Sequence, residues 1–441
     1  MMRRTSALGL RARRGALALA IATAALVIPV SGASAATFHP LFDGSGADGT
    51  LQDSINAANA NGPGNDTILI DNDFYAPDAT MTITTSITII NVDPRVNRAT
   101  SPTGGANIDS GAFTNLDSDT FVVSGANAKL QMRGIILSGG AAGADKAAIR
   151  VTGAGATLQV MNSAVVGNQQ PNIIAEAGTN VDVSNSTIAS SFDTGLINNG
   201  ATVNLTNDTI VQNGSGGIGQ SAGTTNLFNT IVANNTGNQC RGTAGTRNVT
   251  TSLATDSSCS PATVTTTAAL DLGGVNSNGG PTPVPAPGGG PQPGTASSAI
   301  NAGTTPCGTV DQRYFLRPTA PGVCDVGAME VGAVADTTPP SCVPTGTTYP
   351  NADGSLAQQK VNLTDAQSGV LDGGPVSDIL MTPIGTVSFT PLTSVKATST
   401  TTDETNGLVV TATKDANPHS TGDTTWSFTA TDYAGNPKTC S

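Results

Sequence analysis

Four stretches in the middle of the chain share one template: Leu158-Gln-Val-Met-Asn-Ser-Ala-Val165, Val181-Asp-Val-Ser-Asn-Ser-Thr-Ile188, Val203-Asn-Leu-Thr-Asn-Asp-Thr-Ile210 and Asn226-Leu-Phe-Asn-Thr-Ile231. Their asparagines recur after 23, 22 and 22 residues, at Asn162, Asn185, Asn207 and Asn229. Self-similarity at this period is typical of a solenoid, in which each coil buries its apolar side only by stacking on its neighbours.

A second short apolar run lies between successive copies of the template. It is seen at Ile149-Arg-Val151, Ile173-Ile174, Leu196-Ile197 and Ile218. Several short strands in each coil, without any helical period, favour a β-solenoid over helical repeat classes. We therefore predict an all-β fold whose middle is a right-handed parallel β-helix with coils of about 22 residues.

The recurring asparagine has a physical role in such a coil. Asparagine tolerates the left-handed backbone of a sharp bend, and its amide can donate to one neighbour while it accepts from the next. We expect the four asparagines to form a ladder that satisfies polar groups inside the bend. The ladder is a structural feature and says nothing about ligands.

The amino-acid composition is typical of an all-β chain, and the N-terminal residues predict export. Of the 441 residues, 11% are charged and 3% are aromatic, whereas glycine alone contributes 52. Residues 1–35 combine five arginines, an apolar run from Gly15 to Val30 and Ala33-Ser-Ala35, which predicts a secretory signal peptide cleaved near Ala35. The paired arginines also allow a twin-arginine export signal.

The mature chain is acidic, with 14 basic and 31 acidic residues and a formal charge of −17. Nucleic acid and anionic membranes are therefore poor partners. No later stretch has the roughly 20 apolar residues that a membrane span needs. The six cysteines suit an oxidising compartment, and sequence order suggests the disulfides Cys240–Cys259, Cys307–Cys324 and Cys342–Cys440.

Two elements are expected to precede the repeats. The segment Leu51-Gln-Asp-Ser-Ile-Asn-Ala-Ala-Asn59 has apolar residues at 51, 55 and 58, which predicts a short helix that caps the open end of the coils. Residues 66–70 and 81–90 read as strands of the opening coils.

Several motifs carry a family resemblance over residues 40 to 332. Gly49-Thr-Leu-Gln-Asp-Ser-Ile55 followed by Asn65-Asp-Thr-Ile68 resembles the opening of bacterial surface β-helix proteins of the CSLREA and polymorphic outer-membrane-protein type. Five ordered pieces resemble the choice-of-anchor Q module that closes such β-helices: Gly279-Gly-Pro-Thr-Pro283, Ser298-Ala-Ile-Asn-Ala-Gly303, Asp311-Gln-Arg313, Arg317-Pro318 and Cys324-Asp-Val-Gly-Ala-Met-Glu330. The opening lacks the name-giving Cys-Ser-Leu-Arg-Glu-Ala string. In the family a sorting signal usually follows the module, and because none is seen here, a permanent anchor is in doubt.

The last hundred residues are predicted to form a separate unit. Asp336-Thr-Thr-Pro-Pro340 is a stiff polar junction, and alternating strand-like runs follow it. Asp365-Ala-Gln-Ser-Gly-Val370 and Asp432-Tyr-Ala-Gly-Asn436 resemble turns of bacterial immunoglobulin-like modules. The expected organisation is a signal peptide (1–35), a β-helix (36–335) with the closing module at about 270–332, and an immunoglobulin-like β-sandwich (336–441).

Catalytic motifs are not apparent. Parallel β-helices also include pectin lyases and polygalacturonases, but the Gly-His-Gly, Asn-Thr-Asp and Arg-Ile-Lys elements of the latter are missing. Both histidines, His39 and His419, lie outside the repeat, which excludes histidine acid–base chemistry on the coils. The acids of the coils occupy different template positions: Asp145, Glu176, Asp182, Asp193 and Asp208. Asp182 and Asp208 alone lie near each other in the template, which leaves a carboxylate pair across coils open.

Two functional hypotheses remain. The first is an exported, non-enzymatic structural or adhesive protein, extracellular or on the cell surface, that presents a flat polar face to polysaccharide or another cell. The second is a carbohydrate-active enzyme, similar to pectate lyases, that acts on acidic polysaccharide. No cofactor or metal is expected, although calcium stays possible, and the catalytic residues of the second hypothesis are unknown. Grouped carboxylates with an arginine along one face would favour the enzyme.

Overall fold

The computed structural model describes residues 37–38, 40, 49–62, 64–70, 74–77, 79–91, 106–109, 118–140, 143, 145–276, 278, 280, 282, 284–287, 296–318, 324–348, 357–365, 367, 395–403, 407–414, 428–432 and 436–440. The predicted signal peptide, both histidines and Trp426 lie outside this range.

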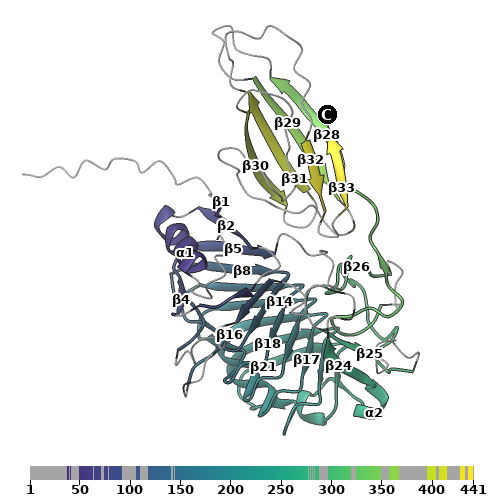
Figure 1. The fold of residues 1–441 in the computed structure, drawn as a ribbon. Coiled ribbons are helices and arrows are strands. Elements are labelled where there is room, and N and C mark those ends of the chain that lie inside the picture. Colours follow the sequence, from purple (N-terminus) through teal and green to yellow (C-terminus); the bar gives the residue numbers. More distant parts are fainter. Residues whose placement is uncertain are drawn as a thin grey trace, which may run out of the picture. The chain divides into compact units, whose positions relative to one another are not determined.

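The first of two long parallel sheets carries the repeat (Figure 1). One strand of each coil belongs to the row β1 (Thr37–Phe38), β2 (Asn65–Ile70), β5 (Ser86–Asn91), β8 (Lys129–Arg133), β11 (Thr157–Met161), β14 (Asn180–Ser184), β16 (Thr194–Thr206), β18 (Gly216–Phe228) and β21 (Thr246–Thr250). A second row, continuous with the first through β16 and β18, contains β4 (Met81–Ile83), β7 (Phe121–Val123), β10 (Ile149–Val151), β13 (Ile173–Glu176) and β20 (Cys240–Arg241).

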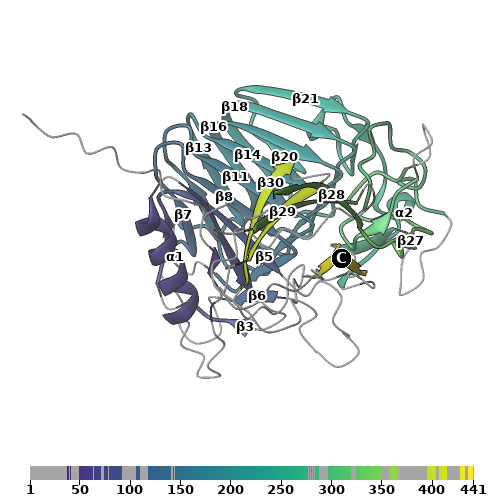
Figure 2. The same ribbon diagram turned by 90° about the horizontal axis from the view of Figure 1, so that it is seen from above.

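The second sheet takes one further strand from each coil. Its strands are β3 (Phe74–Tyr75), β6 (Ala106–Asp109), β9 (Ile135–Ser138), β12 (Ala164–Val166), β15 (Thr187–Ala189), β17 (Thr209–Val211), β19 (Ile231–Ala233), β22 (Leu253–Ala254) and β23 (Thr263–Val264). The chain therefore alternates between the sheets, and each coil hydrogen-bonds to the next (Figure 2). The predicted stacking of parallel strands is confirmed; the hand of winding stays a prediction.

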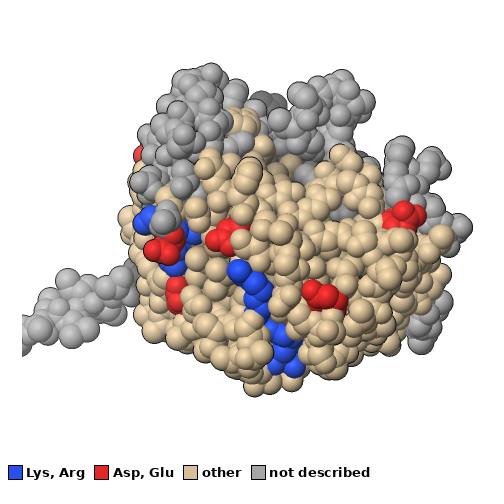
Figure 3. Space-filling view, turned by 90° about the horizontal axis from the view of Figure 1, so that it is seen from below, with Lys and Arg blue, Asp and Glu red and all other residues tan. Residues whose placement is uncertain are grey.

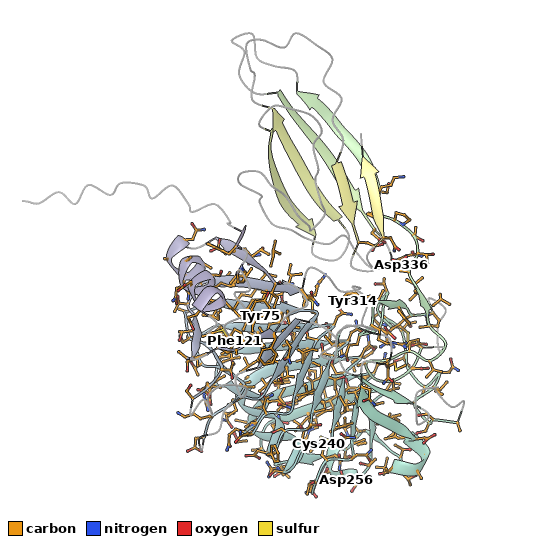
Figure 4. The ribbon with its side chains drawn as sticks, viewed as in Figure 1. Tyr75, Phe121, Cys240, Asp256, Tyr314 and Asp336 are labelled. Carbon is orange, nitrogen blue, oxygen red and sulfur yellow. A yellow bond between two sulfur atoms is a disulfide. The ribbon has the colours of Figure 1, made fainter. Side chains whose placement is uncertain are left out.

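The repeat positions pair in register from coil to coil. Leu158 on β11 pairs with Leu130 on β8 and with Val181 on β14, and Val181 pairs with Val203 on β16. All four side chains are fully buried, as is Phe121, which lies inside the coils (Figure 4). Burial of each aliphatic side chain contributes about 1.5–3 kcal/mol, so stacking supplies the stability that one coil lacks.

Both ends of the coil stack are covered. Helix α1 (Gly49–Asn61) buries Leu51, Ile55 and Ala58 against the first coils, as the apolar spacing predicted. At the other end the 3₁₀ helix η1 (Ser257–Cys259) is tied to β20 by the disulfide Cys240–Cys259. Asp256 accepts hydrogen bonds from the backbone N–H groups of Ser258 and Gln239 there, near Cys240 in Figure 4.

After the coils the chain forms what we call the closing segment, residues 267–335. Its elements are α2 (Thr267–Leu270), the antiparallel pair β24 (Leu272–Asn276) and β25 (Val284–Pro287), and the antiparallel pair β26 (Phe315–Leu316) and β27 (Val334–Ala335). Much of this segment has no regular secondary structure, so its backbone polar groups need partners on the coils and within the segment.

The C-terminal region is antiparallel. A four-stranded sheet has the order β28 (Ser341–Thr348), β29 (Ala357–Thr364), β31 (Gly407–Lys414) and β30 (Val395–Asp403), and β32 (Phe428–Thr431) pairs with β33 (Pro437–Cys440). Two of the strand-like runs that follow the junction, at 359–364 and 408–413, are therefore strands, whereas a third such run, at 386–390, lies outside the described residues. The immunoglobulin-like assignment stays a prediction.

Candidate functional site

The outer face of the first sheet is an ordered array of polar side chains. On β11, β14, β16, β18 and β21, residues that point away from the core form three columns across the coils. We call them the amide face: Thr157, Asn180, Thr202, Thr224 and Thr246; Gln159, Asp182, Asn204, Asn226 and Asn248; Met161, Ser184, Thr206, Phe228 and Thr250. Asp182 is the one charged residue of this set. All members are at least partly exposed.

The central column of the amide face is a hydrogen-bonded ladder. Asn248 Nδ2 donates to Asn226 Oδ1 at 2.7 Å, Asn226 Nδ2 to Asn204 Oδ1 at 2.7 Å, and Asn204 Nδ2 to Asp182 Oδ1 at 2.6 Å. The amides all point in the same direction and end on a carboxylate, which strengthens the ladder because each bond polarises the next. This ladder was not predicted, although Asn204 and Asn226 occupy equal template positions.

The outer face of the second sheet has the opposite character. Ala189, Val211 and Ala233 point away from the coil interior but are buried, because Leu270, Ala299 and Val326 pack on them. The closing segment thus covers the apolar outer face of the second sheet. The amide face is left to solvent, and so in part is the outward column of the second row, which includes Arg150, Ile197 and Arg241.

The four template asparagines do not form the predicted ladder. All four have left-handed backbones, with φ between 46° and 56°, as expected at a sharp bend. Their side chains, however, bond to the closing segment: Asn162 Nδ2 donates to the Asp311 carbonyl at 2.8 Å, Asn207 Nδ2 to the Cys307 carbonyl at 3.0 Å, and Asn229 Nδ2 to the Thr304 carbonyl at 2.7 Å. Asn185 Oδ1 accepts from Arg317 Nη2 at 3.4 Å.

The predicted role of the asparagine was to bond polar groups of the neighbouring coil inside the bend. The residue that follows each asparagine has this role instead. Side chains of Ser163, Ser186, Asp208 and Thr230 each accept the backbone N–H of the corresponding residue one coil earlier, and Ser252 does the same one coil further on. The left-handed bend turns the asparagine outward and its successor inward, which explains the exchange of roles. Burial raises the pKa of Asp208 well above its usual value.

An asparagine ladder does exist at another bend. Asn168 Nδ2 donates to Asn172 Oδ1, Asn172 Nδ2 to Asn213 Oδ1, Asn213 Nδ2 to Asn235 Oδ1, and Asn235 Nδ2 to Gln239 Oε1. All five side chains are buried. This internal ladder satisfies polar groups where the chain passes from the second sheet back to the first.

The motif residues of the closing segment meet in one buried polar cluster. Arg313 Nη2 lies 2.6 Å from Asp311 Oδ2, and Arg317 Nη1 lies 2.9 Å from Glu330 Oε2. Burial, and secondarily the Asp325 carboxylate, raises the pKa of Glu330 to about 7. Burial also raises the pKa of Asp325. The cluster holds three acids and two arginines, so a retained proton balances its charge.

Gln312 links this cluster to the coils. Its Oε1 accepts from Thr187 Oγ1 at 2.7 Å, and its Nε2 donates to Thr282 Oγ1 at 2.7 Å. Thr282 in turn donates to the Asn162 carbonyl. All five quoted motif pieces therefore contact each other or the coils through side chains, which gives them a structural role.

One group of charges on the coils was missed from sequence. Arg150 on β10 lies 3.1 Å from Asp119 Oδ2 and 3.0 Å from Glu176 Oε1, and it also donates to the Asp145 carbonyl. Asp119 precedes β7 and Glu176 ends β13, so stacking brings them to either side of Arg150. Asp182 and Asp208 are not a pair, because Asp182 is on the amide face and Asp208 lies inside a bend.

Three aspartates in the C-terminal region could hold a cation. Carboxylate oxygens of Asp336, Asp365 and Asp432 lie within 4.8 Å of one another, and all three residues are buried. Burial, and then the charges of Asp336 and Asp365, raises the pKa of Asp432 to about 7. Oxygen donors of this kind suit calcium or magnesium. The sequence contained a hint of this group, because each aspartate is the first residue of a segment recognised as a junction or turn: Asp336–Pro340, Asp365–Val370 and Asp432–Asn436.

The disulfides Cys240–Cys259 and Cys307–Cys324 are present, and both are the pairs that sequence order suggested. Cys307 and Cys324 close the loop that bears Asp311 and Arg317. The side chains of Cys342 and Cys440 lie outside the described residues.

Charged groups are sparse on the described surface, as Figure 3 shows for the side seen from below. Among the helices that the structure describes, none combines the length and the apolar character needed to cross a membrane. No protein-family model, curated protein or solved structure matches this chain.

Proposed function

We propose that this chain is an exported, non-enzymatic structural or adhesive protein that acts outside the cell or on its surface. In this proposal a right-handed parallel β-helix displays the amide face, the closing segment seals the second sheet, and an immunoglobulin-like unit serves as spacer or additional binder. The resemblance to bacterial surface β-helix proteins and the predicted signal peptide supply the location.

The amide face is the observation that carries the proposal. Its side chains are uncharged except for Asp182, and they repeat with the strand spacing of about 4.8 Å. Apart from the Asp182 carboxylate, which accepts the end of the ladder, the side chains of the face are amides, hydroxyls and apolar groups, which are poor general bases at neutral pH and offer many equivalent hydrogen-bonding groups. Repeated weak contacts along a rigid scaffold suit adhesion to an extended ligand.

A carbohydrate-active enzyme is the second candidate, and the Arg150 group is what favours it. A lyase that acts on acidic polysaccharide needs a base and acidic ligands on one face. Against this candidate, the Arg150 guanidinium donates to two carboxylates and a carbonyl, which engages its N–H groups in holding three coils together.

Incubation of the secreted protein with polygalacturonate, with and without calcium, separates the two candidates. The proposal predicts no unsaturated or reducing products, and an N-terminus at Ala36. Turnover that is lost in Arg150→Ala but kept in a matched Arg247→Ala variant would establish the enzyme instead.

A further inference from the structure

We infer that the amide face binds a neutral, extended polysaccharide, which lies across the coils along the Asn204–Asn226–Asn248 ladder. The inference deepens the proposed function and rests on it, since it names the site and the chemical class of the ligand.

The asparagines of the ladder have hydrogen-bonding groups that the ladder itself does not use. An asparagine amide has two N–H donors and an oxygen with two lone pairs. Within the part of the chain that the structure describes, Asn204 and Asn226 each donate one hydrogen bond and accept one through their side chains. Each therefore keeps one N–H and one lone pair, and these recur at the coil spacing of about 4.8 Å.

A row of hydroxyl groups lies beside the ladder. Thr202, Thr224 and Thr246 pair in register, and Thr202 and Thr246 are exposed. A threonine hydroxyl both donates and accepts. Sugar hydroxyls do the same, so a polymer of sugars can bond to both rows along their whole length, whereas an apolar ligand would leave the amides unsatisfied.

Charge selects a neutral polymer over an acidic one. From β11 to β21 the amide face has a single charge, the carboxylate of Asp182; its outer columns continue on β8 with Lys129 and Arg133, and the mature chain has a formal charge of −17. Polyuronates would be repelled by Asp182 and by this net charge. A basic polymer would meet one carboxylate on the face, that of Asp182 at the end of the ladder, because the asparagines and the threonine row are uncharged.

Apolar area is available on the same face. Phe228 is half-buried in the third column, two residues from Asn226 of the ladder, and Met161 is half-buried in the same column on β11, beyond Asp182. They can cover the C–H surfaces of sugar rings while the amides bond to the hydroxyls, which is the usual division of labour in ligand sites. The straight, rigid array favours a polymer that is already extended, since less ordering entropy is lost on binding.

Co-sedimentation of the full mature protein with insoluble cellulose, chitin, β-1,3-glucan and mannan tests the inference, with soluble polygalacturonate as the acidic competitor. We expect at least one neutral polymer to retain the protein and polygalacturonate not to release it. The double variant Thr224→Ala/Asn226→Ala should lower affinity about tenfold or more, because about 1–1.5 kcal/mol is lost per bonded group.

Asn238→Ala/Thr243→Ala is the matched control, because both residues are exposed, lie between strands and are not members of the amide face. It should bind as the wild type does. Far-ultraviolet circular dichroism checks the folding of each variant. If the ladder variant folds poorly, Thr202→Lys tests the amide face instead, because Thr202 is exposed and its side chain takes no part in the ladder.

Retention by none of the neutral polymers, equal retention of the ladder variant and the wild type, or binding to polygalacturonate alone would each overturn the inference. Inhibition of ice recrystallisation without glycan retention would assign the array to ice instead. These outcomes leave the non-enzymatic proposal standing; that proposal fails separately, if the retained polymer is cleaved.

Discussion

The side-chain amide of Asn162 donates a hydrogen bond to the backbone carbonyl of Asp311, a residue 149 positions later in the chain. Asn207 and Asn229 make equivalent bonds to the carbonyls of Cys307 and Thr304. The most regular residues of the repeat thus hold the closing segment, which has little regular secondary structure of its own. The same asparagines therefore form the left-handed bend of each coil and hold the closing segment against the second sheet.

Asn207 offers a direct test of this contact. Asn207→Ala removes the bond to Cys307 and forces alanine into a backbone with φ 56°, so we expect a loss of about 2–3 kcal/mol in unfolding free energy. Asn207→Gly removes the bond but tolerates the backbone, and should cost about 1 kcal/mol less. Chemical denaturation measures both. Equal stability of all three proteins would show that the contact contributes nothing.

The internal ladder should be more sensitive than the amide face. Asn213→Ala removes the side-chain acceptor of the Ser191 N–H and one buried hydrogen bond each from Asn172 and Asn235, which we expect to cost about 2–4 kcal/mol. Asn226→Ala, whose neighbours reach solvent, should cost less than about 1 kcal/mol. Thermal melts of the two variants compare them. A larger loss for Asn226→Ala would contradict the assignment of the two ladders.

Glu330 should make stability depend on pH. Its pKa is raised from 4.5 to about 7, so the folded state holds a proton that the unfolded state releases. This contribution is complete below about pH 4.5 and is lost as the pH rises through about 7, a change of about 3 kcal/mol. Glu330→Gln should flatten the decline. A wild-type protein that grows more stable from pH 5 to 8 contradicts this prediction.

The three aspartates predict a second contribution with the same sign. Asp432 has a pKa raised to about 7, partly by Asp336 and Asp365, so stability should fall as the pH rises from about 4 to about 7 when divalent cations are chelated. Asp365→Asn removes one repelling charge and should raise the melting temperature at pH 8 but not at pH 4.

Asp271→Asn, a change at an exposed acid, is the control and should leave both melting temperatures unchanged. If Asp365→Asn lowers the melting temperature at pH 8 in the presence of chelator, the carboxylates do not repel one another as described.

Local patterns predicted what local forces determine. The alternation around Leu158 and Val181 predicted strands, and the spacing of Leu51, Ile55 and Ala58 predicted the capping helix, because both depend on neighbours in sequence. The left-handed bends also followed from asparagine itself. Each of these expectations needs at most one adjacent coil.

Contacts between distant segments were out of reach. The predicted ladder of template asparagines was wrong for Asn162, because its side chain bonds to Asp311, which lies in the closing segment and outside any repeat. Asp119 and Glu176 meet at Arg150 because strands β7, β10 and β13 stack, but they occupy different positions relative to their strands, so no template column contains both. The sequence could not show which outer face the closing segment would cover.

The central claim is that the amide face binds polysaccharide without turning it over. The most direct measurement is one incubation of the mature protein with the insoluble neutral polymer that retains it, in which bound protein and released sugar are both quantified. The account predicts retained protein that depends on Asn226 and Thr224, with no sugar released above a protein-free blank. Sugar release that increases with time and protein concentration would contradict it.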